Sequence, residues 1–560
     1  MRGREFWRFP FFTQRDSLII HCENRSHIID YISSKCYNFY KIRRGGNCMN
    51  NQANNIELRY FSGYIRNRKK LCAELNVSYQ QSRQACEEQV LVRAYLQWGL
   101  EMTSHIFGMF AFAIWDGNAQ KLFVVRDQVG QKQMFYAVVG SDLIYSGDIN
   151  EIAADPRLDK QLNKRMLQQY LFYGYPIGKE TFYEGVFKLL PGHYLEWDGK
   201  TAAVRRYWKP EFKPENTKTA DEWAAEIVST VDEILDEERG DAEVPYKESF
   251  LSGGVDSSYL FAASDAQCAN TVGYAESGFD ESALARHTAE VLNKAFRVKQ
   301  IAPGEFFERI PTVIEKLGQP LGDASAVAFS LGCKAVKEYA DVVYSGEGID
   351  EFFGGYNAHK RPLGEGWTYL TCSHIMSEEV VRSVLSGYDE KVKIADPVTE
   401  IWNETAGQDE LSRKLTIDVS LWLEGDIYLN TDRTSTACGI ELHTPFSDLR
   451  LFELAARIPG EFKFVGDQNK YVFRKAASSK LPDEVAFRKK VGFAVPIRKW
   501  LADESYNKPI AEVLFGEASQ KFFNQSTLKE WWESYLGGEE FLWSRIYAIY
   551  AFLLWYKTNM

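Results

Sequence analysis

Apolar and polar residues alternate in short segments over the first part of the chain. Between about residues 56 and 198 this alternation predicts β-strands, for example at Leu122–Arg126 and Leu143–Ser146. Apolar residues with helical spacing interrupt the strands at Cys86–Trp98 and Asn163–Phe172. The pattern predicts a β-rich region that carries a few helices.

A second pattern begins after Lys209–Asn216, a charged stretch with two prolines that predicts a linker. Apolar strands and amphipathic helices now alternate, and this predicts a parallel sheet with helices on both faces. From about Leu411 the chain is expected to be mainly helical, and it is rich in Trp. The predicted strands are Tyr246–Leu251, Thr271–Tyr274 and Val342–Tyr344, and the predicted helices are Ser257–Ser264, Ser282–Leu292 and Cys333–Tyr339.

Composition and charge exclude several classes of protein. The 560 residues are 45% hydrophobic and 26% charged, which is typical of two to four globular domains. A net charge of −11 argues against a nucleic-acid-binding surface or an anionic-membrane surface. The longest apolar stretches, Ile106–Trp115 and Ile546–Tyr556, are too short to span a bilayer. Nine scattered cysteines without a CxxC pair predict reduced thiols and a cytoplasmic protein.

The first 48 residues differ from the rest of the chain. They hold nine Lys or Arg and four Asp or Glu, and they show no helical or strand periodicity. Arg43-Arg44-Gly45-Gly46, just before Met49, is what a purine-rich ribosome-binding site would encode if it were translated. Two hypotheses follow: residues 1–48 are a mis-annotated leader, or they are a genuine basic extension.

The segment Ser252–Ser258, with the sequence SGGVDSS, is the strongest candidate site. It lies between an apolar strand that ends at Leu251 and a predicted helix, where glycines and helix N–H groups can bind an anion. Asp256 can hold Mg²⁺ against phosphates. The segment is neither GxxxxGK[ST] nor GxGxxG, so it favours binding of a departing pyrophosphate over γ-phosphoryl transfer. A Gly-Gly turn capped by Asp and Ser is the structural alternative.

A second loop, Ser345–Glu351, follows the predicted strand Val342–Tyr344 and carries the sequence SGEGIDE. Its three carboxylates repel one another unless a cation lies between them. Because ligands bind at the carboxyl ends of strands in open α/β sheets, we expect this loop to face the first one.

A third cluster is basic and comprises Lys470, Arg474 and the run Arg488–Phe493. Such runs are often solvated surfaces. Their functional interpretation here is a set of cations that face phosphates and an anionic intermediate.

Together these motifs resemble the glutamine-hydrolysing asparagine synthetase family, over about residues 246–500. The matching segments are SGGVDSS at 252–258, SGEGIDEFFGGY at 345–356, Asp432–Ser435, Gly439–Glu441, Thr444–Asp448, Asn469–Tyr471 with Arg474, and Arg488, Lys490 and Gly492–Phe493. In the front half, Phe107–Asp116, Val125–Lys132, Leu190–His193 and Arg206–Trp208 resemble the glutaminase domain of the same family.

The resemblance implies an α/β protein with two domains. Residues 49–208 would form an antiparallel β-sandwich of the amidotransferase (NTN-hydrolase) type. Residues 217–560 would form a parallel-sheet ATP-pyrophosphatase domain, similar to the adenine-nucleotide α-hydrolases. The implied reaction is adenylation of a carboxylate by Mg·ATP, followed by attack of ammonia or an amine.

The family's functional residues carry over to this sequence by position. Asp256 and Asp350 are the implied Mg²⁺ ligands, and Glu347, Lys490 and Lys470 are the implied catalytic residues. The implied ATP- and pyrophosphate-binding residues are Leu251, Ser252, Gly253, Gly254, Asp256, Ser257, Ser258, Ser345 and Gly346. Asp323 and Ser325 are the implied lining of the acid pocket, although a helix start with Ser325 as a cap is the alternative.

The glutaminase chemistry is missing from the front half. Active members of the family begin with a catalytic cysteine after removal of Met, whereas Asn50 follows Met49 here. The Arg-Gly-Pro-Asp motif is absent, and Ser62-Gly63-Tyr64 stands where the family has Asn-Gly-Glu. Cys48 and Cys72 are not chain-terminal, so we expect them to be structural. We therefore expect an inactive glutaminase half.

Several functions stay open on the sequence alone. The leading one is amidation of aspartate by free ammonia, with a separate ammonia source or a homodimer as partner. The alternatives are amidation of a sugar acid, internal amide closure as in β-lactam synthetases and lasso-peptide cyclases, and a non-catalytic scaffold. Glu347 argues against the β-lactam synthetases, which carry tyrosine there, and the three retained acids Asp256, Glu347 and Asp350 argue against a scaffold.

Overall fold

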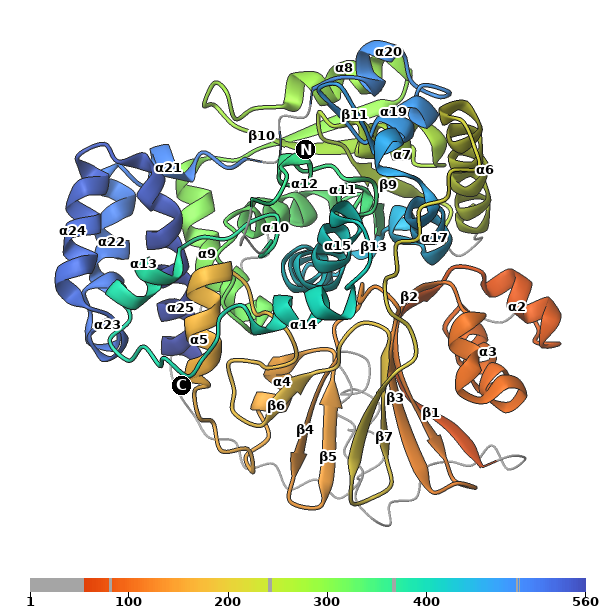
Figure 1. The fold of residues 1–560 in the computed structure, drawn as a ribbon, viewed down its shortest axis with the longest axis horizontal. Coiled ribbons are helices and arrows are strands. Elements are labelled where there is room, and N and C mark those ends of the chain that lie inside the picture. Colours follow the sequence, from red (N-terminus) through yellow and green to blue (C-terminus); the bar gives the residue numbers. More distant parts are fainter. Residues whose placement is uncertain (1–54, 80–82, 240–243, 365–368, 490–491, 493) are drawn as a thin grey trace, which may run out of the picture. The chain divides into compact units, whose positions relative to one another are not determined.

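The structure is a computed structural model that describes residues 55–560, apart from 80–82, 240–243, 365–368, 490–491 and 493 (Figure 1). These residues belong to one structural unit, Tyr40–Met560. The predictions about residues 1–48 and about Lys490 lie outside the described residues. The domain boundaries at residues 208 and 217 stay predictions. The first half is the described chain up to residue 208, and the second half is the chain from residue 217 onward.

The first half contains two antiparallel sheets. One has the strand order β1-β2-β3-β7-β8 and the other has the order β5-β4-β6. The strands are β1 (Ile56–Ile65), β2 (Gly108–Asp116), β3 (Lys121–Arg126), β4 (Phe135–Val139), β5 (Asp142–Ser146), β6 (Val186–Lys188), β7 (His193–Trp197) and β8 (Ala202–Arg206). The helices are α2 (Arg68–Glu74), α3 (Arg83–Trp98), the 3-10 helix η1 (Gly99–Ser104), α4 (Ile149–Ala153) and α5 (Lys164–Tyr173).

Strand β2 shows how the sequence builds this sandwich. Ala111 and Ala113 pack between the two sheets, whereas Phe110, Phe112 and Ile114 pack toward α2 and α3. Side chains alternate between the two faces of a strand, so one apolar strand supplies both cores. The predicted antiparallel sandwich is confirmed.

The second half is built on a five-stranded parallel sheet with the order β11-β10-β9-β12-β13. Its strands are β9 (Lys247–Phe250), β10 (Cys268–Gly273), β11 (Ala295–Gln300), β12 (Val342–Tyr344) and β13 (Glu441–His443). The predicted parallel sheet is confirmed, but its two edge strands were missed. The edge strand β11 is only half-buried, and β13 has three residues, so neither shows a clear hydrophobic pattern.

Helices surround this sheet and form most of the rest of the chain. Helix α10 begins at Ser325 and ends at Val336, so the prediction of a helix over Cys333–Tyr339 began too late. The helices up to residue 417 are α6 (Ala220–Glu238), α7 (Val255–Ala263), α8 (Ser282–Val291), α9 (Pro303–Leu317), α10 (Ser325–Val336), α11 (Ile349–Phe353), α12 (Asn357–Lys360), α13 (Glu378–Val384), α14 (Asp396–Glu404) and α15 (Glu410–Ile417).

A π-helix, η2 (Asp418–Tyr428), begins the C-terminal region, which is mainly helical as expected. The elements after it are α16 (Leu429–Ala437), η3 (Pro445–Ser447), α17 (Leu449–Arg457), α18 (Gly460–Lys463), β14 (Phe464–Val465), β15 (Gln468–Asn469), α19 (Tyr471–Ala477), α20 (Asp483–Ala486), α21 (Ile497–Trp500), α22 (Glu504–Leu514), α23 (Glu517–Phe522), α24 (Gln525–Leu536), η4 (Glu540–Leu542) and α25 (Trp543–Asn559). Within the described part of the chain, every helix is too short or too polar to cross a bilayer.

A buried ion cluster joins the two halves. Glu424 of η2 accepts hydrogen bonds from Arg126 at 2.9 Å and from Lys188 at 2.6 Å, and all three side chains are almost completely buried. Burial lowers the pKa of the Lys188 ammonium, and the Glu424 carboxylate opposes that shift. A second contact is made by α5, which lies beside α25 (Figure 1), where the Tyr170 hydroxyl donates to the Ala548 carbonyl at 2.9 Å.

Replacement of Glu424 tests the importance of the ion cluster. We expect Glu424→Gln to reduce the free energy of unfolding by about 3–5 kcal/mol, because two buried cations lose their anion. Thermal and urea unfolding measure this loss. Glu504, in an exposed pair with Lys508, is the matched control, and Glu504→Gln should leave the free energy of unfolding nearly unchanged. An equal loss of unfolding free energy in Glu424→Gln and Glu504→Gln would contradict the importance assigned to the ion cluster.

Candidate functional site

A cavity of about 280 Å³ lies where the parallel strands β9 and β12 end. The loop after each strand forms part of its wall, as expected for the carboxyl edge of a parallel sheet. The lining includes Leu251, Ser252, Gly254, Asp256, Ser257, Ser345, Gly346, Glu347, Asp350 and Lys470, all of them predicted site residues. The fold therefore brings together side chains that are more than 200 residues apart in the sequence.

The first loop is held in shape by its own serines. Ser257 Oγ accepts a hydrogen bond from the Ser252 N–H at 3.0 Å, and Ser252 Oγ accepts one from the Gly254 N–H at 3.1 Å. Gly253 and Ser258 belong to the same loop but do not line the cavity. The Ser258 side chain is buried, and its hydroxyl donates to the Gly254 carbonyl. Helix α7 begins at Val255, so its first N–H groups point toward the loop.

The second loop packs closely against the first one. A Cβ atom at Gly346 would lie 3.2 Å from the Ser257 nitrogen, so this approach favours glycine. Glu347 accepts a hydrogen bond from Ser345 Oγ at 2.8 Å. The third carboxylate of the loop, Glu351, is buried, and it accepts a hydrogen bond from the Tyr356 hydroxyl at 2.6 Å. Two of the three acids of this loop therefore face the cavity.

Lys470 joins the acids of the two loops. Its Nζ atom donates to Asp256 at 2.6 and 2.9 Å and to Asp350 at 2.8 Å. The ammonium group is buried, and the Lys470 backbone has a left-handed φ of 55°, which non-glycine residues adopt rarely. One cation therefore neutralises part of the repulsion between the two carboxylates.

The pair Asp256 and Asp350 fits Mg²⁺, which takes oxygen ligands and commonly binds through one or two carboxylates plus substrate phosphates. The described residues contain no cluster of three or more His, Cys, Asp or Glu that could hold a metal alone. Any magnesium held here would complete its coordination with phosphates and water, where it would neutralise phosphate charge.

The basic cluster borders the same cavity. Arg474 lines the cavity, and its guanidinium donates to the carbonyls of Asn469, Ala486 and Arg488. Arg474 therefore fixes the backbone just before the predicted catalytic Lys490. Lys490 lies outside the described residues, whereas its neighbour Gly492 lines the cavity.

The predicted acid-pocket residues divide into two roles. Ser325, at the start of α10, lines the cavity, whereas Asp323 is not part of the lining. The Asp323 carboxylate accepts hydrogen bonds from the backbone N–H and the hydroxyl of Ser325. Burial raises the pKa of Asp323. Asp323 therefore orients Ser325, and their contact with substrate stays a prediction.

Sequence reasoning missed two parts of the cavity wall, and one of them comprises Asn270–Val272 of β10 with Phe329 and Gly332 of α10. Ile427, at the end of η2, and Asn430 and Thr431, in α16, form the other part, together with Tyr356. The only available signal was their position directly before the matching segment Asp432–Ser435. Asn430 and Thr431 are polar, and no hydrophobic pattern distinguishes them from solvated helix residues.

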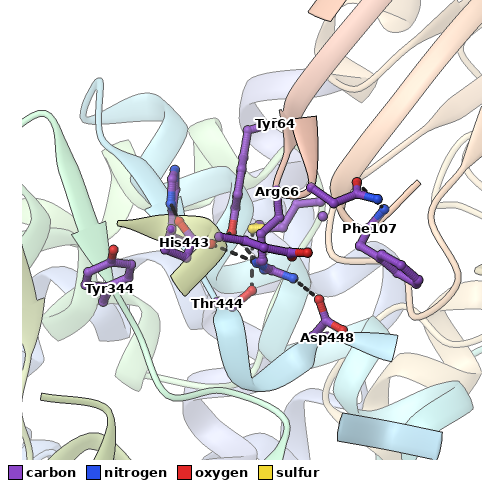
Figure 2. Close-up of polar contacts among 12 residues, drawn as sticks. Tyr64, Arg66, Phe107, Tyr344, His443, Thr444 and Asp448 are labelled. Atoms are coloured by element: carbon purple, nitrogen blue, oxygen red, sulfur yellow. Dashed lines mark hydrogen bonds and ion pairs between the residues drawn. The ribbon is translucent and has the colours of Figure 1, made fainter. Parts of the chain in front are cut away.

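The segment Ser62-Gly63-Tyr64 lies among contacts between the two halves (Figure 2). Gly63, with φ of +112°, precedes Tyr64, whose ring stacks on His443 at a centroid distance of 3.7 Å. The Tyr64 hydroxyl donates to Glu238 at 2.7 Å. Cys72 is buried as a free thiol, whereas Cys48 lies outside the described residues. Tyr64 thus binds the second half through its ring and its hydroxyl.

Two family models match the chain. The model described as asparagine synthase matches residues 237–557, and the model described as a glutamine amidotransferase domain matches residues 40–208.

Curated relatives align over most of the chain. Glutamine-hydrolyzing asparagine synthetase 1 of Bacillus subtilis (strain 168) is 27% identical, over 89% of this chain and 85% of the relative. A putative glutamine-hydrolyzing asparagine synthetase of Mycobacterium bovis is 29% identical, over 74% of this chain and 71% of the relative. Amidase chyE of Penicillium rubens is 25% identical, over 75% of this chain and 71% of the relative. With a matching family model over more than half of its length, the chain belongs to the asparagine synthase family and is a carbon–nitrogen ligase.

Proposed function

We propose that this protein activates a carboxylic acid with Mg·ATP and joins the acyl group to ammonia or an amine, without using glutamine. The observation that carries the proposal is the convergence of Asp256, Asp350 and Lys470 beside Glu347 in one cavity. Aspartate is the default acid, and free ammonium is the default nitrogen source.

The first step forms an acyl-adenylate. A carboxylate oxygen of the acid attacks the α-phosphorus of ATP, the α–β phosphoanhydride bond breaks, and pyrophosphate leaves. In this proposal the loop Ser252–Ser258 binds the phosphates with backbone N–H and hydroxyl groups. Asp256 and Asp350 would hold a magnesium ion that neutralises phosphate charge, and Lys470 and Lys490 would neutralise the negative charge that develops on pyrophosphate.

The second step forms the amide. The amine nitrogen attacks the acyl carbon, the bond between that carbon and the AMP oxygen breaks, and the nitrogen loses a proton. Glu347 lines the cavity and is proposed to accept this proton. Ser345 Oγ, 2.8 Å from Glu347 Oε1, orients the carboxylate. Exclusion of water from the site would protect the acyl-adenylate from hydrolysis.

The state of the front half supports the claim that glutamine is not used. The family's glutamine-binding glutamate is replaced by Tyr64, whose ring and hydroxyl are both committed to residues of the second half. A pocket for a charged amino acid cannot lose its polar partners without a large loss of affinity. Nitrogen would then come from free ammonia or another amine.

Pyrophosphate release tests the function directly. Purified protein with Mg·ATP and ammonium is supplied with aspartate, with sugar acids and with linear precursors of cyclic amides. We expect release with at least one acid and formation of the matching amide. Glutamine in place of ammonium should yield no glutamate, and robust glutamate production would refute the inactive glutaminase. Folded protein that releases no pyrophosphate with any acid would refute the ligase and favour a scaffold.

Substitution of Lys470 tests the charge arrangement. We expect Lys470→Met to reduce pyrophosphate release roughly 100-fold or more, because a preorganised cation is lost. Mg²⁺ alone should raise the melting temperature of this variant more than that of the wild type, because two adjacent carboxylates lose their shared ammonium. Lys475→Met, on the same helix but paired with the exposed Asp221, is the control and should behave as the wild type. Wild-type release by Lys470→Met would contradict the assigned role.

A further inference from the structure

The segment of residues 443–448 contacts both ends of the Ser345–Glu347 loop. The Ser345 N–H donates to the His443 carbonyl at 2.9 Å, as β12 pairs with β13. Ser447 Oγ donates to the Glu347 carbonyl at 2.9 Å. Movement of this segment would therefore move the backbone that carries Glu347.

The same segment is held on its other side by β1 of the first half (Figure 2). Arg66 forms an ion pair with Asp448, donates to Glu238 at 2.8 Å and donates to the Tyr64 hydroxyl at 2.8 Å. The side chains of Arg66 and Asp448 are fully buried. Asp448 is also the N-cap of α17, where it accepts the Arg450 N–H at 2.9 Å.

Tyr64 and Glu238 contact His443, at the other end of the segment of residues 443–448. The Tyr64 ring lies parallel to the His443 ring, with an angle of 8° between them. Glu238, from α6, binds Tyr64, Arg66 and His443 with its two oxygens. Between these ends, the Thr444 hydroxyl donates to Gln131 of the first half at 2.6 Å. Tyr64, Arg66 and Gln131 of the first half thus all contact residues 443–448.

We propose that Tyr64 and Arg66 are positioning residues for Glu347, acting through residues 443–448. This inference rests on the proposed ligase function for its catalytic consequence. The first half would then no longer hydrolyse glutamine and would instead hold the loop of Glu347 in position. A buried and fully hydrogen-bonded ion network suits this role, because loss of one partner leaves another buried charge uncompensated.

The charge of His443 gives the network a pH dependence. The groups that face its ring are Glu238 of α6, Glu441 of β13, Tyr64 of β1 and Tyr344 of β12, with Arg66 and Arg83 bound to the two glutamates. Burial alone would lower the pKa of His443, but the two carboxylates outweigh it and raise the pKa above its ordinary value. Protonated His443 therefore stabilises the fold fully below about pH 6.5, and this contribution is lost as the pH rises through the raised pKa.

Melting temperatures of the wild type and His443→Gln test this dependence. We expect the advantage of the wild type to be largest near pH 6 and to shrink toward about pH 9. An advantage that is constant or grows with pH would contradict a protonated His443.

The central test compares Tyr64→Leu with Tyr170→Leu. Tyr170 is the matched control, because it is also a buried tyrosine of the first half, and its hydroxyl contacts α25 instead of residues 443–448. We expect Tyr64→Leu to reduce kcat for amide formation roughly 10-fold or more, with KM for ATP within about twofold. Tyr64→Phe keeps the ring stack and should recover most of kcat. Ser447→Ala, which removes the hydrogen bond to the Glu347 carbonyl, should reproduce the loss.

Hydrogen exchange followed by mass spectrometry provides a readout that does not depend on activity. In Tyr64→Leu the amide of Ser345 should exchange faster than in the wild type, whereas the amides of β10 should not change. Equal effects of Tyr64→Leu and Tyr170→Leu on kcat and on this exchange would overturn the proposal. If the wild type releases no pyrophosphate, the proposed function fails, and the exchange experiment still decides whether Tyr64 positions the loop.

Discussion

The proposed ligase site is organised around one buried ammonium group between two carboxylates. The parallel order of β9 and β12 places the acids of two loops at the same edge of the sheet, where like charges repel each other. Lys470 donates to both Asp256 and Asp350 and is held in a left-handed backbone conformation by its surroundings. In a partly buried site this interaction is much stronger than it would be in water. In the proposed function the same two carboxylates would hold a magnesium ion together with the phosphates of ATP.

Two further groups of contacts fix the backbone around this cavity. Arg474 binds three carbonyls next to the basic segment, and residues 443–448 support the loop of Glu347. Contacts from the first half reach that segment through Arg66 and the stacked ring of Tyr64. The half that is proposed to be an inactive glutaminase is thereby bound to the proposed ligase site.

Much of this organisation could be predicted from the sequence. Glycines and acids after apolar strands identified both loops, because a parallel sheet brings their ends together whatever lies between them. The mutual approach of Asp256 and Asp350 followed from the same rule. The wall formed by Ile427, Asn430 and Thr431 could not be predicted, since these residues lie at the junction of η2 and α16 and two of them are polar, so no hydrophobic pattern marks them. The role of Tyr64 was also hidden, because its partners Glu238 and His443 are 174 or more residues away. The short edge strand β13 forms because it pairs with β12, and its own composition does not predict a strand.

The most direct measurement follows an oxygen atom from the acid to the nucleotide. A substrate acid labelled with ¹⁸O in its carboxylate is incubated with the protein, Mg·ATP and ammonium, and the products are analysed by mass spectrometry. If the carboxylate attacks the α-phosphorus, one labelled oxygen must appear in AMP and none in pyrophosphate. Label in inorganic phosphate, or turnover that leaves AMP unlabelled, would contradict an acyl-adenylate and with it the account of this site.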